Sequence, residues 1–405
     1  MHTNKITWPL IADIVAISIF CLGMVKNGLD SFSVGIVYLM LIAIGILLVL
    51  KHKISRRLTI KELIPFSIVI ILELPLQKLC GQSYYGWASA FNGVIIFLLM
   101  AVTIFLILDD NNEYVLWKVV NIVAVLSSLL IIIQEIAYLA GIRLDQVSGF
   151  GTTFFNAWKY QFFRPCGPFS EPSHFAELGL LSLYYYLFLS FNKIKVMIIG
   201  LALIVSTSSL GIVGVILLGI LYVLNFSFMR GIKKWKKILI VFVAVVAGVF
   251  LLWWIKNTSN IVVIRMISGG SSSVRVNRSF ELFSVLSGGH KLLGIGIQNQ
   301  QLFLNSFGIV LPSDNYETIS SNREFAQTFG YILCTTGLVG MFSFWGPIIK
   351  AATQSDYRLK VNLILFGFVC VTCCIFSRAT FLVYLMMFFA TRNIMKKEAA
   401  RSEQE

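Results

Sequence analysis

Charged residues are scarce in this chain, and their scarcity excludes an ordinary soluble protein. Only 13% of the 405 residues are Asp, Glu, Lys or Arg, whereas soluble domains carry roughly 25%. Hydrophobic residues make up 57% of the chain, and its mean hydropathy is +0.83. No soluble core could bury that much apolar surface, so the sequence predicts a protein whose solvent is lipid.

Several signatures of enzyme chemistry are also missing. There is no Asp-x-Asp pair, no nucleotide-phosphate loop, no Gly-x-Ser-x-Gly elbow and no His/Cys set with metal-ligand spacing. Cys370-x-x-Cys373 lies inside an apolar run without a second ligand pair, so we interpret it as structural. The seven cysteines give an odd count and imply no disulfide framework. We therefore expect no metal and a metal-independent reaction if the protein is an enzyme.

Long apolar runs recur along the whole chain. Each is roughly 17 to 25 residues long, enough to cross a bilayer as a helix. The sequence predicts an all-α integral membrane protein with about twelve transmembrane helices and no separate soluble domain. Ser206 to Ser209 interrupt one long run, which we divide into two spans. The expected spans are 6–24, 33–50, 62–77, 90–108, 117–140, 174–191, 196–208, 209–228, 238–255, 326–349, 361–376 and 378–392.

Basic connectors predict the orientation of these spans. A net charge of +14 would suggest nucleic acid in a soluble protein, but basic loops on the cytoplasmic side account for it here. The clearest basic connectors are 51–61, 230–237, 350–360 and 392–397. All four lie on one side if the spans alternate, so both termini are predicted to be cytoplasmic and no nucleic-acid partner is expected.

Two long loops remain on the opposite side, and the first covers residues 141–173. It ends in a Pro/Gly-rich stretch that predicts a rigid turn carrying Arg164 and Glu171, with His174 directly after it. Ser170 or Ser173 could cap the following helix, and Glu171 near the first turn would be favoured by the helix dipole. These residues therefore have either a capping or a chemical interpretation.

The second long loop covers residues 256–325 and is basic on the side where basic residues should be sparse. Residues 272–286 predict an amphipathic helix with Phe280 and Phe283 on one face and Arg275 and Arg278 on another. Converging arginines suit phosphate or pyrophosphate, and the alternative is binding of acidic lipid head groups. The ionisable candidates in this loop are Arg265, Arg275, Arg278, His290 and Arg323.

Three segments together resemble the Wzy family of O-antigen and capsular polysaccharide polymerases. They are Arg164-Pro165-Cys166-Gly167-Pro168-Phe169-Ser170-Glu171-Pro172-Ser173, the break from Ser206 to Gly211, and Leu292-Leu293-Gly294-Ile295-Gly296. The resemblance covers most of the chain at the level of layout. It implies a GT-C-like glycosyltransferase of lipopolysaccharide or capsule biosynthesis, with no cofactor. Such an enzyme lies in the bacterial inner membrane with its active site on the periplasmic side.

The resemblance also implies substrates, partners and residue roles. The substrates would be undecaprenyl-pyrophosphate-linked oligosaccharides in membrane lipid, and a Wzz-type chain-length regulator would be a partner. With the residue types, it suggests that Glu171 is the first candidate for the base and His290 the second. The suggested pyrophosphate-binding residues are Arg164, Arg275 and Arg278, with Arg265 in support; His174 and Arg323 are further candidates.

Three other functions stay open from the sequence. An O-antigen ligase shares the topology and usually depends on a histidine in the second long loop, which His290 would match. A polysaccharide transporter or flippase should show charged or broken helices at mid-membrane depth, where Glu73, Gln134 and Glu135 are the principal polar residues. A non-catalytic assembly or signalling protein is the third alternative.

Overall fold

A computed structural model describes most of the second half of the chain and parts of the first. The described residues are 64–79, 94, 113–142, 163–169, 171–225, 271–312, 326–353, 355–376 and 379–403. Every regular element within these ranges is a helix, which confirms the all-α prediction for this part of the protein. The chain divides into two compact units, with described residues 64–116 and 271–403 in unit 1 and 117–225 in unit 2.

Eight of the expected spans fall on described residues, and a helix lies at each. The other four expected spans lie outside the described residues, apart from Val94, so the number of transmembrane helices stays a prediction. Two helical stretches, Leu116–Leu139 and Thr328–Thr353, are long and apolar enough to cross a membrane. The helices at the expected spans are α3 (Ile64–Leu79), α5 (Glu113–Leu139), α6 (Pro172–Tyr184) continued by the π-helix η4 (Tyr185–Leu189), α7 (Lys193–Val205), α8 (Ser209–Asn225), α15 (Thr328–Thr353), α16 (Tyr357–Thr372) and α17 (Ala379–Ser402).

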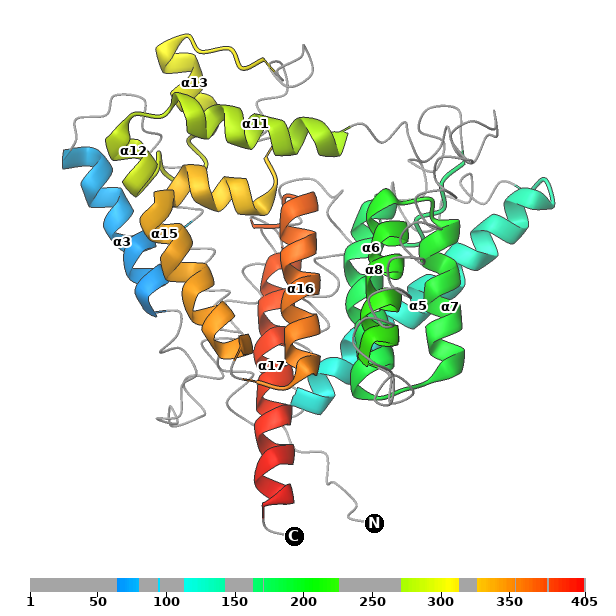
Figure 1. The fold of residues 1–405 in the computed structure, drawn as a ribbon. Coiled ribbons are helices and arrows are strands. Elements are labelled where there is room, and N and C mark those ends of the chain that lie inside the picture. The colour runs from blue at the N-terminus through cyan, green and yellow to red at the C-terminus, as the bar shows by residue number, and fades with distance from the viewer. Residues whose placement is uncertain are drawn as a thin grey trace, which may run out of the picture. The chain divides into compact units, whose positions relative to one another are not determined.

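Unit 2 is built from helices that alternate in direction (Figure 1). The starts of α6 and α8 lie together, where an added Cβ on Gly211 would touch Ala176. Their far ends also meet, with the rings of Phe188 and Tyr222 5.9 Å apart. Helices α6 and α8 are therefore parallel. Leu203, near the end of α7, packs against Gly211 at the start of α8, so α7 runs in the opposite direction.

The helical pair α7 and α8 confirms the predicted division of the 196–228 run. Three buried residues, Ser206, Thr207 and Ser208, separate the two helices. Thr207 has a φ of 52°, in the left-handed region that β-branched residues rarely adopt. Reversal of the chain at this point leaves the three polar residues at the same end of unit 2 as the start of α6.

Aromatic side chains pack helices α3, α15, α16 and α17 of unit 1 against one another. The ring of Phe344 in α15 lies 4.8 Å from Phe66 in α3 and 5.5 Å from Phe381 in α17. Phe366 in α16 stacks on Tyr384 in α17 at 5.8 Å. Such offset and tilted ring pairs add a specific geometry to plain burial of apolar area.

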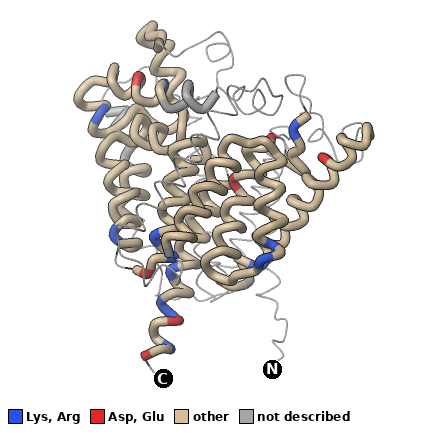
Figure 2. Tube along the Cα trace, turned by 45° about the vertical axis from the view of Figure 1, so that its right-hand side comes forward, with Lys and Arg blue, Asp and Glu red and all other residues tan. Residues whose placement is uncertain are grey.

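Charged residues gather toward the ends of the helices, and hydrophobic and other uncharged residues fill most of the middle (Figure 2). At one end of unit 1, Lys397 in α17 donates both to Oε1 and to Oε2 of Glu113, at 2.9 and 2.8 Å. Arg358, at the start of α16, donates to Glu398 at 2.8 Å. Glu113, Arg358 and the adjacent pair Lys397 and Glu398, which are distant in sequence, therefore meet at the same end.

The Glu113–Lys397 ion pair gives a stability prediction. The Glu113 side chain is only 1% exposed, so Lys397→Met leaves a buried carboxylate without its cation. We expect a loss of about 3 kcal/mol, at the lower end for such pairs because Lys397 is 37% exposed. The melting midpoint in detergent measures this loss, and Glu113→Gln/Lys397→Met should recover most of it. Lys396→Met, at an exposed neighbouring lysine, is the control; equal melting of both single variants would contradict the prediction.

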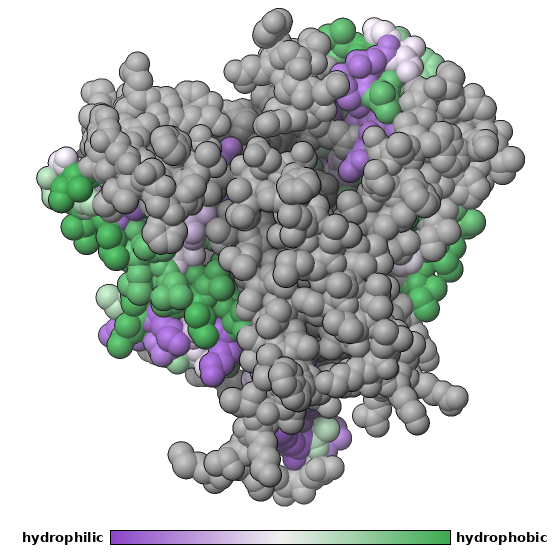
Figure 3. All heavy atoms as spheres, turned by 180° about the vertical axis from the view of Figure 1, so that it is seen from behind, coloured by the Kyte–Doolittle hydropathy of each residue, from purple (hydrophilic) through white to green (hydrophobic). Residues whose placement is uncertain are grey.

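The outer surface of unit 2 is strongly hydrophobic. Figure 3 shows hydrophobic side chains gathered over its helices, with hydrophilic ones at the margin. Contiguous apolar patches of this kind mark contact with a membrane or a partner. Together with the two long apolar helices, this surface indicates association with a membrane. The exposed apolar residues of α5 and α7 include Leu126, Ile133, Ile136, Leu139, Ile194, Met197, Leu201 and Ile204.

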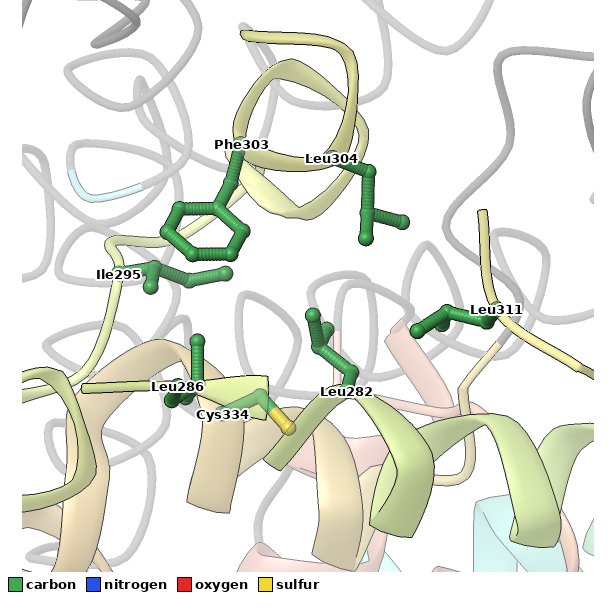
Figure 4. Packing of buried hydrophobic residues seen from close by; sticks show 7 residues of the cluster. All are labelled: Leu282, Leu286, Ile295, Phe303, Leu304, Leu311 and Cys334. Atoms are coloured by element: carbon green, nitrogen blue, oxygen red, sulfur yellow. The ribbon is translucent and has the colours of Figure 1, made fainter. Parts of the chain in front are cut away.

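Three shorter helices of unit 1 lie near the beginning of α15. They are α11 (Ser271–Val285), α12 (Gly288–Leu293) and α13 (Gln300–Phe307). Two of them, α11 and α12, pack directly on α15. Leu282 of α11 and Leu286, which directly follows this helix, point toward Phe303 and Leu304 of α13 across a small apolar cluster (Figure 4). This cluster ties the second long loop to the helix that follows it.

The helix predicted at 272–286 is present as α11, but the predicted placement of its faces is wrong for Arg278. Arg278 is 1% exposed, and its Nη2 donates to Oε1 of Gln301 at 3.2 Å. Leu282 lies one turn further along the same face and is also buried, so this face packs inward and carries Arg278 with it. Phe280 is instead 53% exposed. Arg278 is therefore not displayed on an open face of α11.

The Leu292-to-Gly296 segment binds to α15 at a kink in this helix. Gly337 has a φ of 65° inside α15, which breaks the helical hydrogen bonds at this point. The backbone N–H of Ile295 donates to the carbonyl of Cys334, and that of Gly296 to the carbonyl of Thr335, both at 3.0 Å. Carbonyls just before a helix break need new donors, and this loop segment supplies them.

Candidate functional site

The turn that carries Arg164 is fixed to α5 at two points. The backbone N–H of Gly167 donates to Oε1 of Gln134 at 2.8 Å, and the ring of Phe163 stacks on Tyr138 at 4.6 Å. Gly167 has a φ of 60°, and a Cβ there would come within 3.2 Å of Ile131. Gln134, one of the polar residues expected inside a span, thus anchors the turn. The predicted rigid turn is present.

Arg164 reaches from this turn to the break between α7 and α8. Its Nε donates to the hydroxyl of Thr207 at 3.3 Å, and its Nη2 donates to the carbonyl of the same residue at 3.1 Å. Both bonds come from one edge of the planar guanidinium group. Thr207 thereby sets the direction in which the Arg164 side chain points.

Glu171 occupies the N-cap position of α6. Its backbone is extended, with a φ of −145°, and its side chain makes no capping hydrogen bond. The hydroxyl of Ser173 donates to its Oε2 at 3.3 Å, so Ser173 contacts Glu171 and does not act as the cap. A carboxylate at this end of a helix is favoured by the helix dipole. The capping interpretation and the chemical one are both consistent with this position.

Two further ionisable groups lie in the first turns of α6. His174 is 7% exposed and Glu177 is 1% exposed. Sequence reasoning singled out His174 but missed Glu177, although a carboxylate inside an apolar span is costly and signals a function. Glu177 was overlooked because it lies only three residues after the predicted start of the span, at residue 174. Glu171, His174 and Glu177 follow one another at intervals of three residues.

Cys166 lies between Arg164 and Glu171 in the chain, and the charges of both residues change its pKa. Burial is the main reason that the pKa of the Cys166 thiol rises to about 12. The Glu171 carboxylate raises this pKa further, and the Arg164 guanidinium lowers it. The thiol therefore stays protonated at neutral pH and is a poor nucleophile. The cation and the carboxylate lie close enough to Cys166 for both charges to act on it.

The described candidates of the second long loop, Arg275, Arg278 and His290, lie in unit 1. His290, in α12, shares a hydrogen bond of 2.7 Å between its Nδ1 and the hydroxyl of Ser287, and its ring meets Phe303 edge-on. Burial lowers the pKa of His290 below its ordinary 6.5, so the imidazole is neutral at pH 7. Arg275 lies in α11, and Arg265 and Arg323 lie outside the described residues.

The structure thus brings together the first-loop candidates Arg164, Glu171 and His174 in unit 2. It adds Thr207 and Glu177, which sequence reasoning did not propose for the site. The guanidinium can bind an anionic group, and a carboxylate can accept a proton from a hydroxyl. The roles of the second-loop residues stay predictions.

The Cys370-x-x-Cys373 pair has a structural environment. Both side chains are buried. The carbonyl of Cys373 accepts hydrogen bonds from the backbone N–H and the hydroxyl of Thr328, at 2.9 and 2.7 Å. These bonds join the end of α16 to the start of α15. Within the described ranges, no three His, Cys, Asp or Glu side chains are grouped as metal ligands would be.

Comparison with known proteins adds no relative to this picture. No protein-family model matches the chain, and no curated protein sequence is significantly similar to it. The resemblance to the Wzy polymerases therefore depends on the three sequence segments that carry it. The site geometry is an independent observation.

Proposed function

We propose that the protein is a polysaccharide polymerase of the Wzy kind in the bacterial inner membrane. It would transfer a growing glycan from undecaprenyl pyrophosphate to a lipid-linked repeat unit at the periplasmic face. The observation that carries the proposal is that Arg164 and Glu171 both lie near Cys166, on the turn that Gln134 anchors at one end of an apolar helical unit. An anion-binding cation and a base are the groups that this transfer needs.

The chemistry assigns one task to each group. A hydroxyl of the acceptor sugar attacks the anomeric carbon of the donor, and the bond from this carbon to the pyrophosphate oxygen breaks. Glu171 takes the hydroxyl proton, and Arg164 stabilises the charge that develops on the departing undecaprenyl pyrophosphate. In the proposal Arg275 and Arg265 contribute further positive charge. Arg278 would have to leave its bond to Gln301 to join them.

Contacts within unit 1 support the proposed orientation of the spans. In the twelve-span arrangement, Glu113, Arg358 and the C-terminal residues that follow the last span are all cytoplasmic, and the Glu113–Lys397 and Arg358–Glu398 bonds join them. Helix α15 runs from helices α11 and α12 to Lys350. In the proposal, α11 and α12, at the opposite end of α15, are therefore periplasmic.

A transporter is the second candidate function, and two observations favour it. Helix α15 is broken at Gly337, and Glu177 is buried within α6. Broken helices expose carbonyls that bind ions in transporters. In this protein, however, the carbonyls of Cys334 and Thr335 accept hydrogen bonds from the loop segment. The break thus serves to dock the loop, which favours the polymerase.

One assay separates the candidate functions. Purified protein in liposomes is supplied with synthetic undecaprenyl-pyrophosphate-linked repeat units, with and without lipid A core. A polymerase yields a ladder of glycans on lipid pyrophosphate without lipid A core. A ligase yields one product, and only with the core acceptor. Movement of labelled substrate across the bilayer without a new glycosidic bond would identify a transporter and end the polymerase proposal.

A further inference from the structure

The break between α7 and α8 contains a residue that is unusual for its position. Helix α7 ends with Ser206 as its C-cap, and the next residue, Thr207, is left-handed with a φ of 52°. This position after a helix is most often glycine, sometimes asparagine, because a Cβ is disfavoured there. Threonine is among the poorest choices because its Cβ is branched. Its presence therefore calls for a compensating role.

The contact with Arg164 supplies that role. The left-handed backbone turns the Thr207 carbonyl toward Nη2 of Arg164, at 3.1 Å, while the hydroxyl accepts from Nε at 3.3 Å. A glycine would keep the carbonyl contact but would lack the hydroxyl. Hydrogen bonds to a charged group are stronger than neutral ones and fix the plane of the guanidinium. Strain of this kind is typical of functional sites.

We infer that Thr207 is a positioning residue that orients Arg164 toward a lipid-linked pyrophosphate. The inference rests on the proposed function, because it takes Arg164 as the residue that binds the pyrophosphate. Thr207 itself touches no substrate in this arrangement. Its hydroxyl and carbonyl accept hydrogen bonds from one edge of the guanidinium, so the guanidinium faces the anion in a fixed direction. The Arg164 side chain therefore loses less conformational entropy when the anion binds.

Thr207→Gly separates this role from a structural one. Glycine suits the left-handed position, so the melting midpoint should be equal to that of the wild type or higher. Loss of the hydroxyl contact should weaken binding of undecaprenyl pyrophosphate in detergent micelles by about tenfold, as for one hydrogen bond to a charged group. Thr207→Ser keeps the hydroxyl and should bind within about twofold of the wild type. A purely structural threonine would show stability and binding falling together.

A double-mutant cycle with Arg164→Lys tests whether Thr207 acts through the guanidinium. Lysine cannot present an edge to Thr207, so Thr207→Gly should have no further effect on binding in that background. Wild-type binding by Thr207→Gly, or an equal loss in both backgrounds, overturns the inference. Coupling in the cycle together with no glycosyl transfer by the wild type would refute the polymerase proposal alone. Absence of any undecaprenyl pyrophosphate binding by the wild type overturns both.

Discussion

Gly294→Ala is expected to destabilise the protein by about 3 to 5 kcal/mol, through left-handed strain and overpacking together. Gly294 has a φ of 83°, and an added Cβ would collide with the backbone carbonyl of Thr335. Gly337 faces it, and a Cβ there would collide with the carbonyl of Leu292. Neither obstacle is a movable side chain. The substitution should therefore expel the Leu292-to-Gly296 segment from the kink of α15.

Gly289→Ala provides a matched control for this prediction. It lies five residues earlier, in α12, and a Cβ there would meet nothing within 4 Å. We expect Gly289→Ala to melt close to the wild type and Gly294→Ala to melt well below it. Proteolysis within 286–311 should also become faster in Gly294→Ala alone, because Ile295 and Gly296 lose their acceptors. Equal melting of the two variants would show that the segment docks in some other way.

The helices and one of their breaks could be predicted from the sequence because both depend on local composition. Long apolar runs give helices, and three consecutive polar residues at Ser206, Thr207 and Ser208 mark the reversal between α7 and α8. Gly337 gave no comparable signal, because single glycines are common in membrane helices. Its kink depends on a segment some forty residues earlier in the chain, so only the folded protein reveals it.

The candidate site shows the same division between local and long-range information. The rigid turn with Arg164 and Glu171 followed from its prolines and glycine. The burial of Arg278 did not follow from the helical repeat, because the repeat groups residues into faces without saying which face packs inward. Leu282 and Leu286 decide this by packing against α13. The pairing of Arg164 with Thr207 joins residues 43 positions apart, which no local pattern encodes.

The contact of the second long loop with the kink of α15 and the contact of the Arg164 turn with Gln134 both fix a loop to a helix. In each long loop, backbone N–H groups donate to a helix: to the Gln134 side chain in the first loop, and to the carbonyls of Cys334 and Thr335 in the second. A site built on rigid supports loses less entropy when substrate binds and keeps reacting groups aligned. For a transfer between two lipid-linked substrates, such rigidity would place the acceptor hydroxyl relative to the base.

Glu171→Gln is expected to lower the turnover of lipid-linked repeat units by a factor on the order of 100 to 10,000, the usual range for a lost general base. The amide has the shape of the carboxylate and can still accept the hydrogen bond from Ser173, so folding and KM should change little. Glu177→Gln and His174→Ala, made in the same helix, are the companion variants. A loss confined to Glu171→Gln would assign the base to the N-cap residue.

The pH profile of turnover distinguishes Glu171 from His290 as the base. A base works only when deprotonated, so turnover falls as the pH drops through its pKa. Burial lowers the pKa of His290 below 6.5, so a rate governed by His290 would be constant around pH 7 and fall only below 6.5. If Glu171 is the base, turnover by His290→Gln should still fall as the pH is lowered, because the titrating base is still present. If turnover by His290→Gln shows no such fall and Glu171→Gln keeps full activity, His290 is the base. The fall of turnover with pH is set by the group that accepts the proton.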